Sequence, residues 1–298
     1  MLLYGILFGL GAATCQSLSY IGSRWFVVRY TDGAWRLLVW SHAIMGLTSL
    51  LFLPMAWSAG MPPARQYVLP LCGAGGFYLA GQAGLFLLMR TTEASRIAPL
   101  LALKILILAV ISVAVMRQHL TLSQWLAAGL CVSAAFLLTQ SGARLSAGKL
   151  LMLLFICTAY SLSDLHIAAL VRSLRPLSPI RASVVGTCLT YVLCGACVLP
   201  FVPSAAARRQ PGEVWRAGPF AAAWLISMVL LYACFAFVGP IYGNILQSTR
   251  GLISIMLGAV LAQAGQRQIE EKTSRRLLVQ RLLAALLMTA AVWLFQKK

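Results

Sequence analysis

The chain has 298 residues, of which 60% are hydrophobic and only 10% are charged, whereas a soluble domain carries about 25% charged residues. This composition excludes an ordinary soluble domain and indicates a chain that is solvated by lipid. The net charge is +18, with 24 Lys and Arg against 6 Asp and Glu. The basic residues mostly flank apolar segments, where they would meet lipid headgroups, so this charge predicts no nucleic-acid partner.

Apolar segments follow one another along the chain and are joined by short connections, which leave no room for a separate soluble domain. Each segment is long enough to cross about 30 Å of hydrocarbon as a helix that rises about 1.5 Å per residue. We predict ten transmembrane helices, at residues 2–22, 36–57, 67–89, 95–116, 121–140, 149–171, 180–202, 219–238, 241–262 and 277–295.

The two halves of the chain repeat the same features in the same order. The offset between matching positions is nearly constant, at 144 to 146 residues, and the matches are Ser17-Leu18-Ser19 with Ser161-Leu162-Ser163, Leu53-Pro54 with Leu199-Pro200, and Lys104 with Arg250. Each repeat holds five spans, an odd number, so the second repeat must cross the membrane in the opposite sense to the first. The predicted fold is therefore an all-α membrane protein with ten transmembrane helices as two inverted five-helix repeats, at residues 1–142 and 143–298.

The fourth and fifth spans of each half carry a family pattern. In the first half it comprises residues 93–104, from Glu93-Ala94-Ser95 to Leu103-Lys104, and residues 117–126; in the second half it lies between Gly239-Pro240 and Gln280. Over nearly its whole length the chain resembles the EamA-type ten-helix members of the drug/metabolite transporter superfamily. The resemblance implies export of a metabolite from the cytoplasm and both termini inside, whereas the Lys and Arg bias of the loops would place the termini outside.

The chain departs from the family pattern at two intramembrane positions. Where the family often has a carboxylate, this chain has Lys104 in one half and Arg250 in the other. A cation at the centre of a bilayer costs about 2.5–3.5 kcal/mol on insertion scales, and neither residue lies close to a span end. We interpret the pair as an anion site, in which Arg250 binds a carboxylate or phosphate bidentately and Lys104 acts as a point charge. The structural alternative is that each cation pairs with Asp164 or with helix-end carbonyls and ties the halves together.

Other polar residues gather on the same spans. Asp164 is the only acid well inside a span, and it would neutralise a cation, bind a substrate amine or carry a proton. Polar side chains also link helices without any role in transport, at about 0.6 kcal/mol each. With that alternative open, the predicted substrate-binding residues are Lys104, Arg250, Ser17, Ser161, Asp164, Tyr78, Gln82, Gln247, Tyr160 and Tyr232, with Gln16, Tyr20 and Trp224 near them.

No motif for catalysis accompanies these residues. The sequence contains no Walker A motif, no His, Cys or Asp cluster with metal-ligand spacing and no evident Ser/His/Asp set. We therefore expect neither an enzyme nor a cofactor or metal site.

The function predicted from these features is secondary transport by alternating access. We expect an exporter of a small anionic or zwitterionic metabolite, such as an amino acid or a carboxylate-rich compound, in the bacterial inner membrane, with membrane lipids and possible coupling protons as its other partners. The alternative is a flippase for a lipid-linked phosphate or a phospholipid headgroup. A third hypothesis is an accessory subunit or enzyme that delivers or modifies lipids, for which the sequence offers no catalytic candidate.

Overall fold

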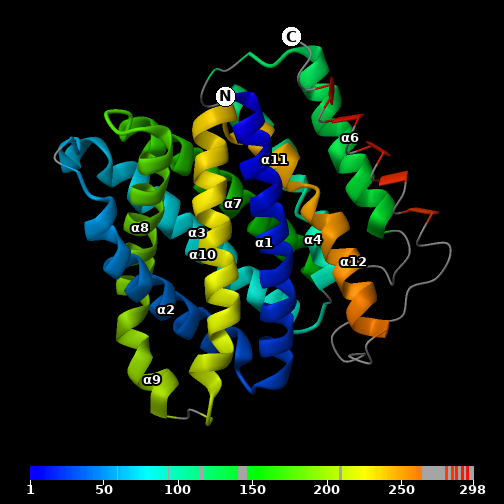
Figure 1. Cartoon of the computed structure of the whole chain (residues 1–298). Coiled ribbons are helices and arrows are strands. Elements are labelled where there is room, and N and C mark those ends of the chain that lie inside the picture. The colour runs from blue at the N-terminus through cyan, green and yellow to red at the C-terminus, as the bar shows by residue number, and fades with distance from the viewer. Residues whose placement is uncertain are drawn as a thin grey trace.

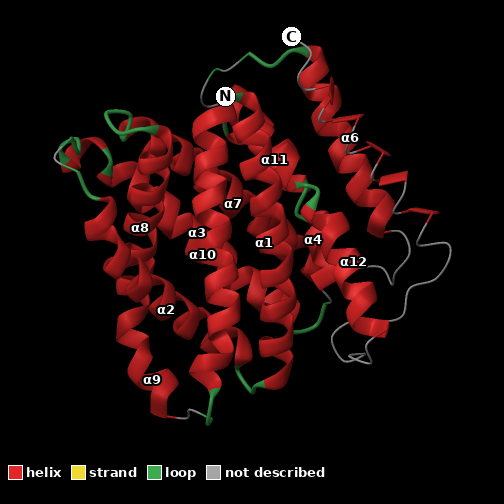
Figure 2. Ribbon diagram, in the orientation of Figure 1, coloured by secondary structure: helices red, strands yellow, loops and turns green. Residues whose placement is uncertain are grey.

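The structure, a computed structural model, describes residues 1–58, 60–92, 94–114, 117, 119–139, 146–207 and 210–263, with short pieces between 279 and 294. Within these residues every regular element is helical and no strand occurs (Figure 2). Six helices in the described part are long and apolar enough to cross a membrane. They are α1 (Leu2–Arg29), α2 (Gly33–Ala56), α3 (Val68–Met89), α7 (Ala147–Ser173), α8 (Pro179–Val198) and α10 (Glu213–Val238).

These six helices confirm the first three and the sixth to eighth predicted spans, although several helices extend past the predicted ends. The helix α1 continues to Arg29 and α10 begins at Glu213, where the prediction set the limits at 22 and 219. The extra turns carry Arg24, Arg29 and Arg216. Basic residues interrupt the apolar pattern, but at a membrane surface they do not end a helix.

The predicted fourth and ninth spans are each broken into two helices. The fourth consists of α4 (Ala94–Leu100) and α5 (Leu103–Ala114), and the ninth of α11 (Pro240–Gln247) and α12 (Arg250–Gln263). Each break lies directly before a buried cation.

Local hydrogen bonds account for the two breaks. At the second break, the hydroxyls of Ser248 and Thr249 donate to the carbonyls of Ile245 and Leu246, at 2.6 and 2.8 Å, in competition with the helix ladder. At the first break, the amide of Lys104 donates to the carbonyl of Leu101, three residues back, which is 3₁₀ rather than α geometry.

The helices pack into one bundle (Figure 1). Extensive contacts join α1 to α10, α3 to α7 and α2 to α8, while α5 packs on α7 and α12 packs on α1. The α2–α8 contact depends on Gly46 and Gly195, since a Cβ added to either would lie 2.7–2.8 Å from the other's Cα atom. Small residues allow such close packing of membrane helices.

The remaining elements are shorter. The 3₁₀ helix η1 (Ala64–Gln66) precedes α3, η2 (Leu199–Phe201) joins α8 to α9 (Val202–Ala207), and α6 (Leu122–Thr139) occupies the predicted fifth span. The predicted tenth span lies largely outside the described residues, as do the predicted boundary between the repeats at 142 and the motif residue Glu93.

Candidate functional site

The two intramembrane cations lie at the starts of the second helices of the broken pairs. Lys104 is the second residue of α5 and Arg250 is the first of α12, and their exposed fractions are 4% and 3%. Two serines hold the main chain at these points. Ser161 of α7 shares its hydroxyl hydrogen between the carbonyls of Cys157 and Lys104, at 2.8 and 3.0 Å. Ser17 of α1 does the same with the carbonyls of Ala13 and Arg250, at 2.8 and 3.0 Å.

The charge of Lys104 is compensated by a carboxylate. Its Nζ lies 3.0 Å from Oδ2 of Asp164 and 3.2 Å from Oε1 of Gln247. The same carboxylate oxygen accepts a hydrogen bond of 2.8 Å from Nδ2 of Asn244. Nζ also lies 5.9 Å from the centre of the Tyr160 ring, within the range of a cation–π contact. The pairing that the structural alternative predicted between a cation and Asp164 is therefore present.

Arg250 has neutral partners only, within the described residues. Its Nη1 donates to Oε1 of Gln16 at 2.9 Å and reaches Oε1 of Gln247 at 3.4 Å, and its guanidinium lies 5.8 Å from the centre of the Tyr20 ring. Its Nε has no hydrogen-bond partner in the part of the chain that the structure describes. Since Asp164 compensates Lys104, the cluster is left with the positive charge of Arg250.

A small cavity of about 20 Å³ lies between these groups. It has room for about one water molecule, whereas sites for small molecules usually measure about 300–1,000 Å³. The bundle is therefore closed around the cluster. The cavity is lined by Gln16, Tyr20, Tyr78, Lys104, Tyr160, Ser163, Asp164, Ile167, Trp224, Met228, Leu231 and Arg250.

The structure brings most of the predicted site residues together. Lys104, Arg250, Asp164, Tyr78 and Tyr160 line the cavity, and Gln247 joins the two cations, while Ser17 and Ser161 hold the main chain beside them.

Two further predicted residues neither line the cavity nor bond to Lys104 or Arg250. Gln82 accepts a hydrogen bond of 2.6 Å from the Tyr160 hydroxyl. Tyr232 donates to Oγ1 of Thr190 at 2.9 Å, between α10 and α8.

Asn244 is a member of the cluster that the sequence analysis missed. It supports the carboxylate of Asp164, and it also donates to the carbonyl of Pro240 at 2.8 Å. Its position three residues before Gln247 places both side chains on one face of α11. That spacing could have identified it.

An aromatic layer covers one side of the cavity. The Trp224 ring stacks on Phe220 and Tyr78, at centroid distances of 5.8 and 5.9 Å, and its Nε1 donates to the Tyr191 hydroxyl at 2.6 Å. Phe86 meets Phe220 edge-on at 5.3 Å. Since Phe220 lies one turn before Trp224 on α10, this layer separates the cavity from the end of the bundle at which α10 begins.

A buried ion pair closes that same end. Nη1 of Arg36, on α2, lies 2.8 Å from Oε2 of the fully buried Glu213, the first residue of α10. Nε1 of Trp40 and the amide of Gln210 donate to the same carboxylate, at 3.2 and 3.0 Å. The sequence analysis missed this pair, although an acid directly after Pro211-Gly212 is typical of a helix start.

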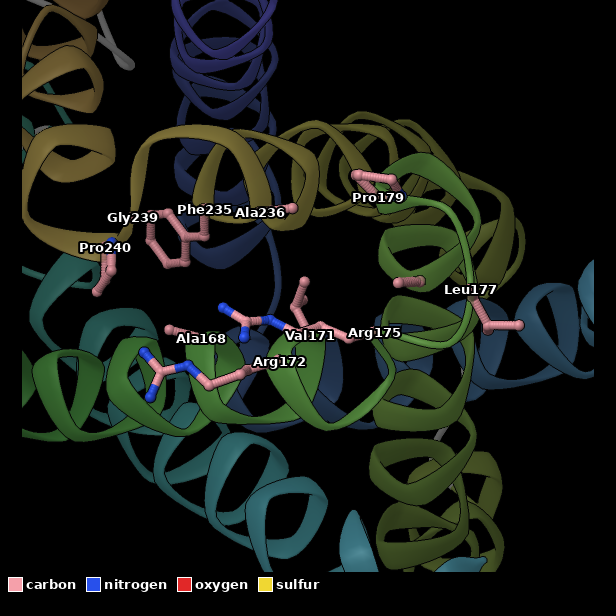
Figure 3. Close-up of a pocket in the computed structure, with 11 residues that line it drawn as sticks. Ala168, Val171, Arg172, Arg175, Leu177, Pro179, Phe235, Ala236, Gly239 and Pro240 are labelled. Carbon is pink, nitrogen blue, oxygen red and sulfur yellow. The ribbon is translucent and has the colours of Figure 1, made fainter. Parts of the chain in front are cut away.

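A wider pocket lies at the opposite end of α10 (Figure 3). We call it the end pocket. It measures about 350 Å³ and lies where α7 ends, α8 begins and α10 meets α11. It is lined by Ala168, Val171, Arg172, Arg175, Leu177, Pro179, Ala182, Phe235, Ala236, Gly239 and Pro240.

Comparisons with known proteins give a family match for part of the chain and a fold match for nearly all of it. Residues 3–140, from α1 through α6, match the sequence model of the EamA-like transporter family. A solved crystal structure is similar over 98% of this chain and 98% of its own, with a TM-score of 0.67 and 13% sequence identity, which supports the fold alone. No curated protein matches the sequence significantly.

Proposed function

We propose that this chain, which belongs to the drug/metabolite transporter superfamily through its EamA-like residues 3–140, is a secondary transporter of a small anionic or zwitterionic metabolite. The proposed substrate is an amino acid or a carboxylate-rich compound. The proposed setting is the bacterial inner membrane and the proposed direction is export. Transport would proceed by alternating access around the Lys104–Arg250 cluster, which serves as the substrate site.

The observation that carries this proposal is that Arg250 has no carboxylate partner among the described residues. A buried guanidinium is expensive in a membrane unless an anion compensates it, and the described residues supply only amide and aromatic partners. A carboxylate on the substrate would supply that compensation through two parallel N–H···O bonds.

The Lys104–Asp164 pair suits a zwitterionic substrate. A substrate ammonium group would bind Asp164, and a second carboxylate would compete with Asp164 for Lys104. Protonation of Asp164 would free Lys104 in the same way, which is the basis of the proposed coupling to protons. In each case Asn244 and Gln247 adjust their hydrogen bonds, because both already contact the pair.

The proposed architecture is two inverted five-helix repeats, residues 1–142 and 143–298. In this arrangement α1 of the first repeat corresponds to α7 of the second, α2 corresponds to α8, and α3 corresponds to α10. The packing supports it, since α1 packs on α10 as α7 packs on α3, and α12 packs on α1 as α5 packs on α7. The same correspondence relates the bond from Ser17 to Arg250 with the bond from Ser161 to Lys104. It also relates the two helix breaks that precede these cations.

The two ends of the bundle support alternating access. At one end, the aromatic layer and the Arg36–Glu213 pair separate the cavity from the surface. At the other end, the end pocket approaches the same cavity. A transporter closed at one end and partly open at the other is one of the states that the cycle requires.

Thermal unfolding of the purified protein against a panel of ligands tests the proposal. The panel comprises amino acids, di- and tricarboxylates, and phospholipid headgroups. A ligand of the folded state raises the melting temperature by mass action, so a water-soluble carboxylate should stabilise the wild type and fail to stabilise Arg250→Ala. Arg181→Ala, which removes an exposed arginine of α8, is the matched control. Stabilisation by phosphorylated lipids alone would favour the flippase alternative instead.

A further inference from the structure

The end pocket combines a cavity of metabolite size with positive charge. Its volume of about 350 Å³ falls within the range of about 300–1,000 Å³ that small-molecule sites occupy. Among the described residues that line it, two are arginines and none is an acid. The guanidinium of Arg175, in the turn after α7, lies in the gap in front of Phe235, and that of Arg172 lies along α7 near Ala168 (Figure 3).

The start of α11 adds to the positive potential of the pocket. Gly239 precedes this helix with a positive φ of 78° and an extended ψ of 168°, which glycine readily adopts, and Pro240 is its first residue. Both residues line the pocket, so the first turn of α11 and its positive dipole end lie at the pocket wall. Two arginines and a helix N-terminus at one cavity favour a carboxylate or a phosphate.

The lining also contains apolar side chains. They include Val171, Leu177 and the ring of Phe235. A ligand that joins an anionic group to an apolar or aromatic body therefore fits this lining.

The end pocket and the central cavity share two helix faces. On α7, Asp164 and Ile167 line the cavity while Ala168 and Val171 line the pocket, all at helical spacing on one stripe, and Arg175 follows in the turn after the helix.

On α10, Met228 and Leu231 line the cavity and Phe235 lines the pocket, again at spacings of three and four residues. Ile167 and Leu231, which are 1% and 2% exposed, lie between the two spaces.

We propose that the end pocket is a second anion-binding site, at which an anion binds before it passes Ile167 and Leu231 to reach Lys104 and Arg250. The loading role rests on the proposed function, whereas binding of the anion at Arg172 and Arg175 does not. The shared chemistry is a carboxylate or phosphate group, which a soluble solute or an anionic lipid headgroup can carry.

Arginine footprinting of the wild-type protein in a neutral detergent tests the binding. Phenylglyoxal modifies accessible guanidinium groups, and peptide mass spectrometry measures the rate at each residue. The probes are inorganic phosphate, dihexanoyl phosphatidylglycerol and, as the zwitterionic control, dihexanoyl phosphatidylcholine. At a probe concentration of twice Kd, modification of Arg172 and Arg175 should slow about threefold by mass action, and Arg181 should react at an unchanged rate.

The two anionic probes separate the sources of the ligand. Protection by inorganic phosphate assigns the pocket to a soluble anion, and protection by phosphatidylglycerol alone assigns it to a lipid headgroup. Protection by neither probe, or equal protection of Arg181, overturns the proposal.

The same footprint in Arg250→Gln separates this inference from the proposed function. Protection of Arg172 and Arg175 should persist there, because the two sites are distinct. In transport assays, Arg172→Gln with Arg175→Gln should raise KM at least about fivefold with kcat nearly unchanged, which is the effect of lost ground-state binding. If protection is absent while Arg250→Ala still abolishes transport, only the end-pocket proposal fails.

Discussion

The hydroxyl of Ser161 donates to the main-chain carbonyl of Lys104 across 3.0 Å and so joins α7 to the start of α5. Ser17 makes the equivalent bond to Arg250, also at 3.0 Å, from α1 to α12. Each buried cation thus follows a helix break that a serine from the other half of the chain stabilises. The arrangement places both charges at one depth in the bundle, on either side of Gln247.

The serine bonds are expected to position the cations. Ser161→Ala should lower the apparent affinity for substrate about two- to tenfold, the effect of about 0.5–1.5 kcal/mol for one hydrogen bond. Ser17→Ala should act similarly, and the double variant should show the sum, because the two bonds share no partner. Transport kinetics in proteoliposomes measure these effects, with the exposed Ser204→Ala as control. If all three serine variants transported substrate with the kinetics of the wild type, the positioning role would be refuted.

The guanidinium geometry of Arg250 should matter beyond its charge. Arg250→Lys keeps a cation but loses the planar fork that holds a carboxylate at two points. Substrate affinity should fall about tenfold or more in this variant, and Arg250→Gln should bind more weakly still. Titration of the melting temperature against substrate gives both dissociation constants. An Arg250→Lys protein with wild-type affinity would argue against bidentate binding.

Lys104 and Asp164 are expected to depend on each other for the stability of the folded protein. Asp164→Asn leaves a buried ammonium without its carboxylate, at a cost of about 3–5 kcal/mol, and Lys104→Met leaves the opposite charge. The combination Lys104→Met with Asp164→Asn should regain much of the stability, because both charges are gone, while transport stays lost. Thermal unfolding of the three variants provides the test. Additive losses in the double variant would show that the two charges do not stabilise each other.

The Arg36–Glu213 pair is expected to hold α2 against the start of α10. Glu213→Gln should lower the melting temperature and change the transport rate, since it removes the buried anion that Arg36 and Trp40 both contact. The charge swap Arg36→Glu with Glu213→Arg should recover part of both properties. A Glu213→Gln protein with wild-type stability and rate would exclude this role.

The sequence predicted the long membrane-spanning helices but not the breaks within the fourth and ninth spans. Hydropathy identified α1, α2, α3, α7, α8 and α10, because apolar composition alone determines whether a segment can span a membrane. The breaks before Lys104 and Arg250 escaped it, since Leu101, Ala102, Ser248 and Thr249 continue an apolar or neutral pattern. Their geometry depends on hydroxyls from other helices as well as on local bonds.

The candidate site was likewise predicted only in part. The offset between Lys104 and Arg250 predicted that the two cations meet, and both contact Gln247 in the structure. The Arg36–Glu213 pair could not be predicted, because its partners lie 177 residues apart and no motif links them. The end pocket depends on where α7 and α10 end and where α8 begins, which hydropathy does not specify.

Counterflow transport of a radiolabelled carboxylate substrate, identified by its thermal stabilisation of the protein, tests the central claim most directly. It compares proteoliposomes of wild type, Lys104→Ala, Arg250→Ala and the control Arg181→Ala, each first shown to be folded by its unfolding transition. The account predicts that both cavity variants lose transport while Arg181→Ala retains it. Undiminished transport by Lys104→Ala and Arg250→Ala would contradict the proposal that these two cations form the substrate site.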